Sequence, residues 1–443
     1  IQWEDNMSMT QRKIFLFALM GIALITVGFL QSWNVALAIF NMCIISAIMT
    51  LGVNIQWGYA GLFNAGIMGF TIIGGLAAVL VSIPPVEATW TVGGSNILIG
   101  LIALIITVFA SVVTWKKTDS LKKGRFIPTI AVIIIGYIII RLITGPAIDL
   151  IENTEAAKTG YLGGLGLPIL FSWFIGGVFA AGIAWVIGKI TLELRSDYLA
   201  IATLGISGII LYIVKNEDWL TRGVKNVNGI PRPVPYEINL QNEIWFQDLA
   251  ILIGMPVRDF STIFVKCCYA GLFITVLLCF LWLSEKALRS PWGRMMRAIR
   301  DNETAARAMG KDVPKRHLQV FVLGSAMIGV AGAMLATLEG QFTPMSFTPL
   351  RYTFVIWVMV IVGGSGNNLG SILGGFLIWF FWVESEPIGI WLINTTTGIL
   401  SEDHPIKVHL IESVAHMRYM TMGIILLLVL RFAPKGLIPE EKL

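Results

Sequence analysis

Runs of about 20 apolar residues recur along the whole chain, and a helix needs about that many to cross a bilayer. Of the 443 residues, 56% are hydrophobic and only 13% are charged, whereas soluble domains are about 25% charged. A backbone embedded in lipid has to satisfy its own hydrogen bonds, so these runs are expected to be helical. The sequence therefore predicts an all-α integral membrane protein, a polytopic bundle with a single transmembrane domain over residues 1–443.

Twelve candidate spans can be placed, and two of them differ from the rest. Segment 352–364 is short and segment 58–82 is rich in glycine, so either can be a broken or re-entrant helix. We therefore expect about 10–12 transmembrane segments. The spans are expected at 12–30, 34–53, 58–82, 96–115, 126–144, 169–189, 197–214, 261–284, 318–338, 352–364, 368–394 and 410–431.

The distribution of Lys and Arg predicts the orientation of the bundle. With the N-terminus inside, the interior segments hold 21 of the 32 Lys and Arg, whereas the long exterior loops, about 145–168 and 215–258, hold six. Cytoplasmic loops carry the basic excess in membrane proteins. We therefore expect a multi-pass protein of the cell inner (plasma) membrane with both termini cytoplasmic. The chain begins at Ile1, so its true start is expected to be missing or processed.

One exterior loop has a distinctive composition. Residues 228–235 read NGIPRPVP, and three prolines with a glycine predict a stiff, irregular strap rather than a helix. The loop around it is long enough to form a docking or gating surface, and a solvated connector is the alternative.

The interior loop at about 285–317 is strongly charged and contains its own helix signals. Residues 289–317 hold eight Lys and Arg and three acidic residues. Ser290 and Pro291 are typical of a helix start. Asp301 is expected to cap a second helix over 302–309, and Gly310 to end it.

This second helix would have one small, weakly apolar face. Asn302, Ala305, Ala306 and Met309 follow helical spacing, and Glu303 can pair with Arg307 on another side. A two-turn helix is marginal alone in water. We therefore expect it to dock into a groove on a soluble partner. The alternative is a loop that binds no partner and is basic only because cytoplasmic loops carry an excess of Lys and Arg.

Several motifs resemble a known family of membrane proteins. Residues 305–310, AARAMG, resemble the EAA loop of ABC importer permeases, although Thr304 stands at the family's Glu position and Glu303 precedes it. The chain from Gly293 to Met334 is similar to the LivM family of branched-chain amino-acid permeases. The same family is resembled by GYAGLFNAG (58–66), LRSDYLAIATLG (194–205), NGIPRP (228–233), VGGSGNNLGSILGG (362–375) and FAPKGL (432–437).

The resemblance implies a permease subunit of an ATP-driven importer that moves branched-chain or related amino acids inward. It implies two cytoplasmic ABC ATPase subunits that hold ATP and Mg, a second homologous permease subunit (a heterodimer is expected) and an extracytoplasmic solute-binding protein. The expected ATPase-coupling residues are Arg297, Arg300, Asp301, Glu303, Ala305, Ala306, Met309 and Gly310.

The resemblance leaves the solute open. Leu62 and Asn64 replace the family's usual Gln and Ser in a segment expected within the membrane. Urea or short amides, carried by sister permeases, are therefore an alternative. The resemblance also assigns no role to the segment 96–165, which is longer than usual for the family.

Two glycine-rich segments, 58–70 and 362–368, are expected to break their helices. Broken helices in the two halves of a transporter point to its transport site, and ordinary packing through small residues is the alternative. Hydroxyl side chains on the span 197–214 add polar groups. The expected pathway residues are Tyr59, Gly61, Asn64, Gly66, Tyr198, Thr203, Ser207, Gly363, Gly364, Ser365 and Gly366.

Other functions lack support in the sequence. No phosphate-binding GxxxxGK[ST], HExxH or nucleophile elbow occurs, so we expect no enzymatic activity and no cofactor in this chain. The four histidines follow no usual zinc spacing, so no metal site is expected. The net charge of +5 follows from the interior loops, and no nucleic acid is implied. An ion-coupled transporter working alone would need deep carboxylates, and Glu384 and Glu386 are expected near the exterior end of their span.

Overall fold

The computed structural model describes residues 8–117, 126–156, 159–398 and 404–440. Within these ranges, ten helices are long and apolar enough to cross a membrane, so the prediction of an all-α polytopic protein is confirmed. These are α1 (Met9–Leu30), α2 (Trp33–Ala60), the continuous α4–η1–α5 (Glu87–Thr89, Trp90–Gly94, Ser95–Lys117), α6 (Phe126–Asn153), α7 (Ile169–Thr191), α8 (Ser196–Asn216), α12 (Val257–Arg289), α15 (Val313–Glu339), α17 (Asn368–Thr396) and η5–α19 (Val414–His416, Met417–Phe432).

Both spans that the sequence marks as irregular are incomplete helices. The segment 58–82 divides into the end of α2, a non-helical stretch at 61–66, and α3 (Ile67–Ser82). The segment around 352–364 forms η4 (Leu350–Phe354) and α16 (Val355–Gly363). At about 1.5 Å per residue, α3 and η4–α16 are roughly 20–25 Å long, shorter than the hydrocarbon core of about 30 Å.

The centre of the bundle is formed by α2 and α15, the two most buried spans. Helices α3 and α7 pack on α15, and α17 and α12 pack on α2. Small residues permit these close approaches: a Cβ at Gly52 would lie 2.7 Å from the Gly324 carbonyl oxygen on α15. Consequently little room remains in the centre for side-chain rearrangement.

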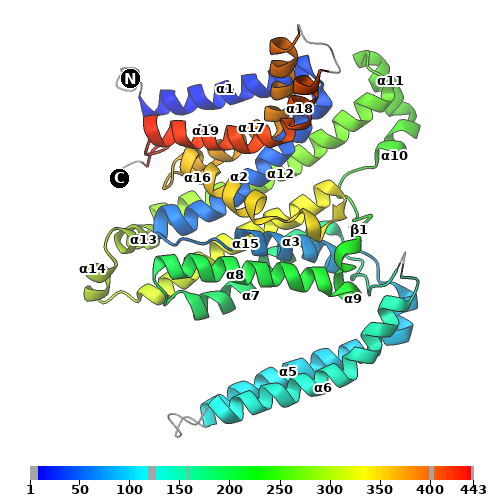
Figure 1. Ribbon diagram of the computed structural model, residues 1–443, viewed down its shortest axis with the longest axis vertical. Helices are drawn as coiled ribbons and strands as arrows, with labels where there is room; N and C mark the ends of the chain where they lie inside the picture. Colours follow the sequence, from blue (N-terminus) through cyan, green and yellow to red (C-terminus); the bar gives the residue numbers. More distant parts are fainter. Residues whose placement is uncertain (1–7, 118–125, 157–158, 399–403, 441–443) are drawn as a thin grey trace.

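The long helices run side by side, so the molecule has two distinct ends (Figure 1). At one end, called the α14 end, lie α13 (Pro291–Asp301) and α14 (Glu303–Ala308), together with the first turn of α1 and the last turn of α19. The opposite end is called the β1 end. It carries α9 (Asp218–Thr221), η2 (Gly223–Lys225), β1 (Val227–Asn228), α10 (Glu237–Asn242) and α11 (Ile244–Ile253).

The strap expected at 228–235 is confirmed as irregular, since no helix forms between Asn228 and Glu237. The strand β1 before it pairs antiparallel with β2 (Gln341–Phe342), with Val227 opposite Phe342. This pairing, not foreseen from the sequence, attaches the strap to the end of α15. The short helices η3 (Pro344–Ser346) and α18 (Pro405–Glu412) complete the fold.

Helices α5 and α6 form a hairpin that projects from the bundle (Figure 1). They pack on each other and on η1, and α6 contacts the remaining chain through α9. α6 continues to Asn153, so the first residues of the exterior loop expected at about 145–168 are helical. Its last turns are held by a small cluster in which Ala147 and Ile151 are buried with Ile97 and Leu162. The hairpin's connecting segment, 116–125, holds five of the 21 Lys and Arg assigned to the interior, and most of it lies outside the described residues.

Candidate functional site: a two-helix loop joined to two helix breaks

The charged loop folds into two short helices, each with its own start signal. Ser290 precedes α13 and Pro291 takes its first position, as predicted. The prediction that Asp301 caps the second helix is wrong by one residue. Asp301 belongs to α13, and the Asn302 side chain accepts a hydrogen bond from the Ala305 N–H at 2.9 Å. Gly310 then ends the loop helix in a left-handed conformation, φ +75°, which glycine adopts without strain.

The residues of the face predicted for α14 are partly buried in the protein and partly exposed. Ala306 is buried, whereas Ala305 is exposed and the Met309 side chain, just past the helix end, is 79% exposed. The Glu303–Arg307 ion pair forms at 2.7 Å on the exposed side. Asp301 and Gly310 are exposed as well. Ala306 therefore attaches α14 to the bundle, and Met309 is left as an apolar knob.

Two of the three arginines of α13, Arg297 and Arg300, turn inward rather than toward a partner, whereas Arg294 is exposed. Met296 and Ile299 bury one face of this amphipathic helix. Arg297 donates to the Leu288 carbonyl oxygen at 3.3 Å. Arg300, only 24% exposed, donates to the Gly58 carbonyl oxygen near the end of α2 and lies 3.0 Å from the Glu440 carboxylate.

Arg300 thereby joins three segments that are far apart in the sequence. Its Nε also donates to Asp301 at 3.2 Å. Burial acts to lower the pKa of Arg300, but the hydrogen bonds and charges of Glu440 and Asp301 raise it above its ordinary value. The guanidinium therefore stays charged and forms a fixed connection between the loop, α2 and the C-terminal tail.

The stretch 61–66 after α2 turns back along that helix. Gly61 ends α2 with φ +70°. Asn64, fully buried, donates to Gln56 Oε1 at 2.9 Å and accepts from the Gly66 N–H at 2.8 Å. Its carbonyl oxygen accepts from Trp357 Nε1 on α16 at 3.0 Å. The polar atoms of Asn64 are thus used within the protein, as a buried polar group in a membrane requires.

A second break, at 364–367, contacts the first one. Gly364 and Gly366 have φ +117° and +83°. Asn54 on α2 accepts from the Gly366 N–H at 2.9 Å, and Gly58 lies directly against Gly366. The structure therefore brings together the two glycine-rich segments, 58–66 and 363–366, that the sequence singles out. Tyr59 is buried beside them, and Ser365 lies between the two positive-φ glycines.

The C-terminal tail covers this second break. The N–H groups of Leu437 and Ile438 donate to the carbonyl oxygens of Val362 and Gly363, both at 2.9 Å. Ile438 is fully buried. In the sequence, this tail stood out only through the motif FAPKGL (432–437). A short segment with Gly and Pro has no periodicity that would predict where it packs.

The hydroxyl residues of α8 divide into two groups. Thr203 Oγ1 accepts from the Ala65 N–H at 3.1 Å, so this residue joins the first break. Ser207 is buried against Gly69 of α3. Tyr198 is 62% exposed and lies apart from both. Thr203 and Ser207 therefore lie with the predicted pathway residues, and Tyr198 does not.

Arg351, which the sequence did not single out, lines a cavity. Arg351 stacks over Tyr352 and over Trp379, the latter at 5.2 Å, and its Nε is buried with no hydrogen-bond partner among the described residues. Trp379 is near the middle of α17, so the guanidinium lies beside a candidate membrane span. It lines a cavity of about 600 Å³ with Trp382, Ile390 and the ion pair of Glu386 with Arg418, among others. The sequence could have indicated Arg351, because it is a cation at the edge of an apolar run. Charged side chains inside a membrane cost free energy and therefore usually have a function.

The described residues form ten apolar helices long enough to span a membrane, and two further spans are interrupted. The charged α13–α14 loop is bound to both interruptions through Arg300 and Gly58. This architecture is that of a polytopic membrane transport protein. Residues 155–430 match the family model described as branched-chain amino acid transport system / permease component. Since this is more than half of the sequence, the chain belongs to that family. The match begins after the α5–α6 hairpin.

Individual relatives agree with the family match. A probable branched-chain amino acid transport permease protein LivM of Methanocaldococcus jannaschii is 24% identical over 394 residues, 89% of this chain and 90% of the relative. The high-affinity LivM permease protein of Escherichia coli K12 is 29% identical over 207 residues, 46% of this chain and 48% of the relative. No solved structure matches the chain significantly. The chain is therefore a transport permease, as predicted.

Proposed function

We propose that this chain is the membrane subunit of an ATP-driven importer that carries branched-chain amino acids into the cell. Its family and the names of its relatives support the substrate class. One observation supports the coupling: Arg300 joins the α13–α14 loop to Gly58, and Gly58 lies against Gly366. A displacement of the loop would thus be transmitted to both helix breaks.

The proposed orientation places the α14 end in the cytoplasm. The loop 285–317 and both chain ends contribute most of the basic residues there, in accord with the rule for interior charge. Both described ends of the chain lie at this same end of the bundle (Figure 1). The strap at the β1 end then faces the exterior, where a solute-binding protein would deliver its cargo.

The proposed partners are two cytoplasmic ATPase subunits, a second homologous permease and an extracytoplasmic binding protein. ATP and Mg would be held by the ATPases. The exposed Met309 at the end of α14, with Ala305 on the helix, is best suited to enter an ATPase groove, because its apolar surface can be buried there without disturbing the bundle. The bilayer surrounds the remaining spans.

The motion proposed for transport starts in α14. When the ATPases close, α14 moves, α13 moves with it, and Arg300 transmits the shift to the end of α2 and to the tail. The stretch 58–66 and the turn 363–366 would then change the access to the pathway. Asn64 and Thr203 act in this proposal as clamps of the first break rather than as ligands of the solute.

The cavity beside Arg351 supports an amino acid over urea. The Arg351 guanidinium has a buried Nε with no hydrogen-bond partner among the described residues, although the Glu339 carboxylate interacts with it electrostatically. Such a group suits the carboxylate of an amino acid, and Trp382 and Ile390 offer apolar walls for its side chain. Urea carries no charge to match this arginine.

The expectation that Glu384 lies near the end of its span is wrong, because it lies near the middle of α17 and is only 3% exposed. One of its carboxylate oxygens accepts a hydrogen bond from Gln31, and the other has no partner among the described residues. Glu386 pairs with Arg418, so the ion-coupled alternative would rest on Glu384 alone.

Competition for uptake tests the substrate class. Cells that express the complete transporter should take up radiolabelled leucine, and excess isoleucine or valine should suppress this uptake. Leucinamide, which lacks the carboxylate, and urea should not compete. Suppression by urea, with none by valine, would replace this proposal with the short-amide alternative.

A further inference from the structure

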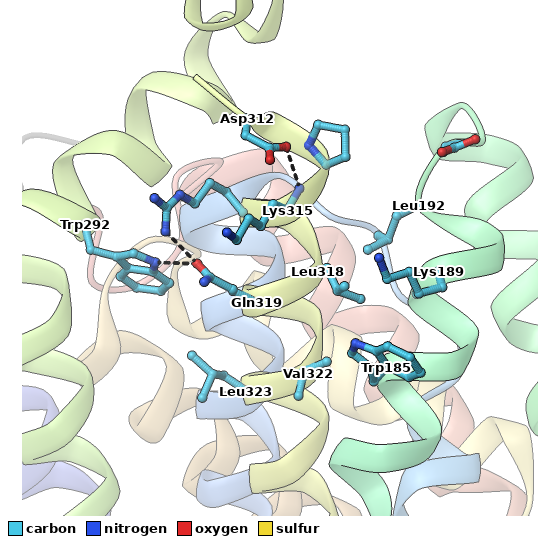
Figure 2. A pocket seen from close by; sticks show the side chains of 14 residues that line it. Trp185, Lys189, Leu192, Trp292, Asp312, Lys315, Leu318, Gln319, Val322 and Leu323 are labelled. Carbon is cyan, nitrogen blue, oxygen red and sulfur yellow. Dashed lines mark hydrogen bonds between the residues drawn. The ribbon is translucent and has the colours of Figure 1, made fainter. Parts of the chain in front are cut away.

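A large cavity opens at the α14 end between α7, α13 and α15 (Figure 2). Its volume is about 910 Å³. It shares no lining residue with the cavity of Arg351, and it adjoins a smaller cavity beside the first helix break through Leu192, Glu193 and Pro314. Its lining changes in character along its depth, and this change indicates what it binds.

Charged and aromatic side chains gather at the mouth of the cavity. Lys189, Lys315 and Arg316 line it, and the Lys189 ammonium lies 5.9 Å from the ring centre of Trp185. Trp292 Nε1 and Arg316 both donate to Gln319 Oε1, at 3.4 and 2.9 Å (Figure 2). Tryptophan with lysine or arginine at the end of a span marks the boundary between headgroups and acyl chains.

The deeper wall of the cavity is apolar. Leu318, Val322 and Leu323 follow one another along α15 below the charged mouth (Figure 2). From Lys315 to Leu323 the helix rises by about 12 Å. Leu323 is 51% exposed and Trp185 is 53% exposed, although both lie on candidate membrane spans, so this side of the cavity is open toward the lipid.

The cations at the mouth lack matching carboxylates. Across the described residues, Lys189, Lys315 and Arg316 take part in no ion pair within 4.0 Å. Of the two acidic residues in the lining, Asp312 accepts from the Lys315 N–H at 3.2 Å and so caps α15. Glu193 is the other. The mouth therefore retains a positive excess.

We propose that this cavity binds an anionic phospholipid of the cytoplasmic leaflet. Its phosphate would lie between Lys189, Lys315 and Arg316, and an acyl chain would follow Leu318 to Leu323. A soluble protein surface or a free phosphate could satisfy the cations but would leave the apolar wall uncovered. An amphiphile with a negative head satisfies both parts. The assignment to the cytoplasmic leaflet depends on the proposed orientation of the bundle, whereas the site itself does not.

The position of this lipid would influence the coupling loop. Gly310 lies only two residues before Asp312, and α15 and α7 pack along each other. A bound lipid would bridge the ends of these two helices beside the loop. Occupancy would therefore hold the loop in the arrangement that α14 presents to its partner.

Native mass spectrometry of the purified transporter tests the site. The probe is phosphatidylglycerol in phosphatidylcholine nanodiscs, and the variant is Lys189→Gln with Arg316→Gln. Each basic residue near an anionic lipid contributes roughly a fivefold factor, so phosphatidylglycerol binding should weaken by about 25-fold. Lys286→Gln is the matched control, because Lys286 lies 4.9 Å over Trp282 at the same helical spacing but lines no part of this cavity. It should leave binding unchanged.

A second variant separates a lipid from a soluble anion. Val322→Trp would fill the apolar wall and keep every cation, so it should abolish retention of phosphatidylglycerol if an acyl chain lies there. Inorganic phosphate should not displace the lipid. The proposal is overturned if the charge variant retains phosphatidylglycerol like the control, if phosphate competes while Val322→Trp has no effect, or if the charge variant loses only the ATPases. Because lipid retention is the readout, this result is independent of the solute.

Discussion

Replacing Arg300 with glutamine tests whether the loop and the helix breaks move as one unit. The substitution keeps a long polar side chain but removes the charge and the forked donors that reach Gly58 and Glu440. Arg294 supplies the control. It lies on the same helix and is exposed, and among the described residues its side chain donates only to the Arg289 carbonyl oxygen, at 3.4 Å.

The size of the effect follows from the burial of the partners. The side chains of Arg300 and Glu440 are 24% and 28% exposed, so solvent screens their interaction only in part. Hydrogen bonds to charged groups contribute about 1.5–3 kcal/mol in such settings. If that free energy links the loop to the breaks, its loss corresponds to roughly a 10- to 150-fold loss of coupling.

The assay is the number of leucine molecules taken up per ATP hydrolysed by the purified complex. Arg300→Gln should lower this ratio at least about tenfold while ATP hydrolysis continues, and Arg294→Gln should leave it unchanged. Glu440→Gln should give a smaller loss, because Arg300 keeps its bond to Gly58. Equal ratios for both arginine variants would show that Arg300 transmits nothing.

Three further substitutions have defined outcomes. Met309→Asp should weaken ATPase binding about 10- to 100-fold, measured by pull-down titration, with no change in the melting temperature of the permease, because this side chain is exposed; undiminished binding would remove Met309 from the docking surface. Asn64→Leu should lower that melting temperature, because the buried Gln56 amide and Gly66 N–H each lose a partner at a cost of about 1–3 kcal/mol; an unchanged value would contradict the clamp. Arg351→Gln should raise the leucine concentration for half-maximal uptake by about tenfold, with Arg351→Lys intermediate; an unaltered concentration dependence would place the solute elsewhere.

Features carried by local sequence could be predicted. Apolar length located the spans and marked 352–364 as short, and glycine content singled out 58–82. Cap chemistry placed α13 and α14 to within one residue. The one error arose because Asp301 and Asn302 are both good caps, and only the geometry of the turn decides between them.

Features that depend on distant partners could not be predicted. Nothing near Arg300 indicates that it turns toward Gly58 and Glu440, which lie 242 and 140 residues away. Tyr198 and Thr203 stand on one predicted span, but helical rotation sends only Thr203 to the break. The α5–α6 hairpin has the same apolar composition as the core helices, and hydropathy does not distinguish lipid contact from protein contact.

Uptake into sealed proteoliposomes tests the central proposal most directly. The complete transporter is reconstituted with the binding protein and leucine outside, and vesicles are loaded with or without ATP and Mg. We predict that leucine accumulates only with luminal ATP and that Met309→Asp abolishes the accumulation. Equal accumulation without ATP, driven by a proton or sodium gradient, would contradict an ATP-driven permease.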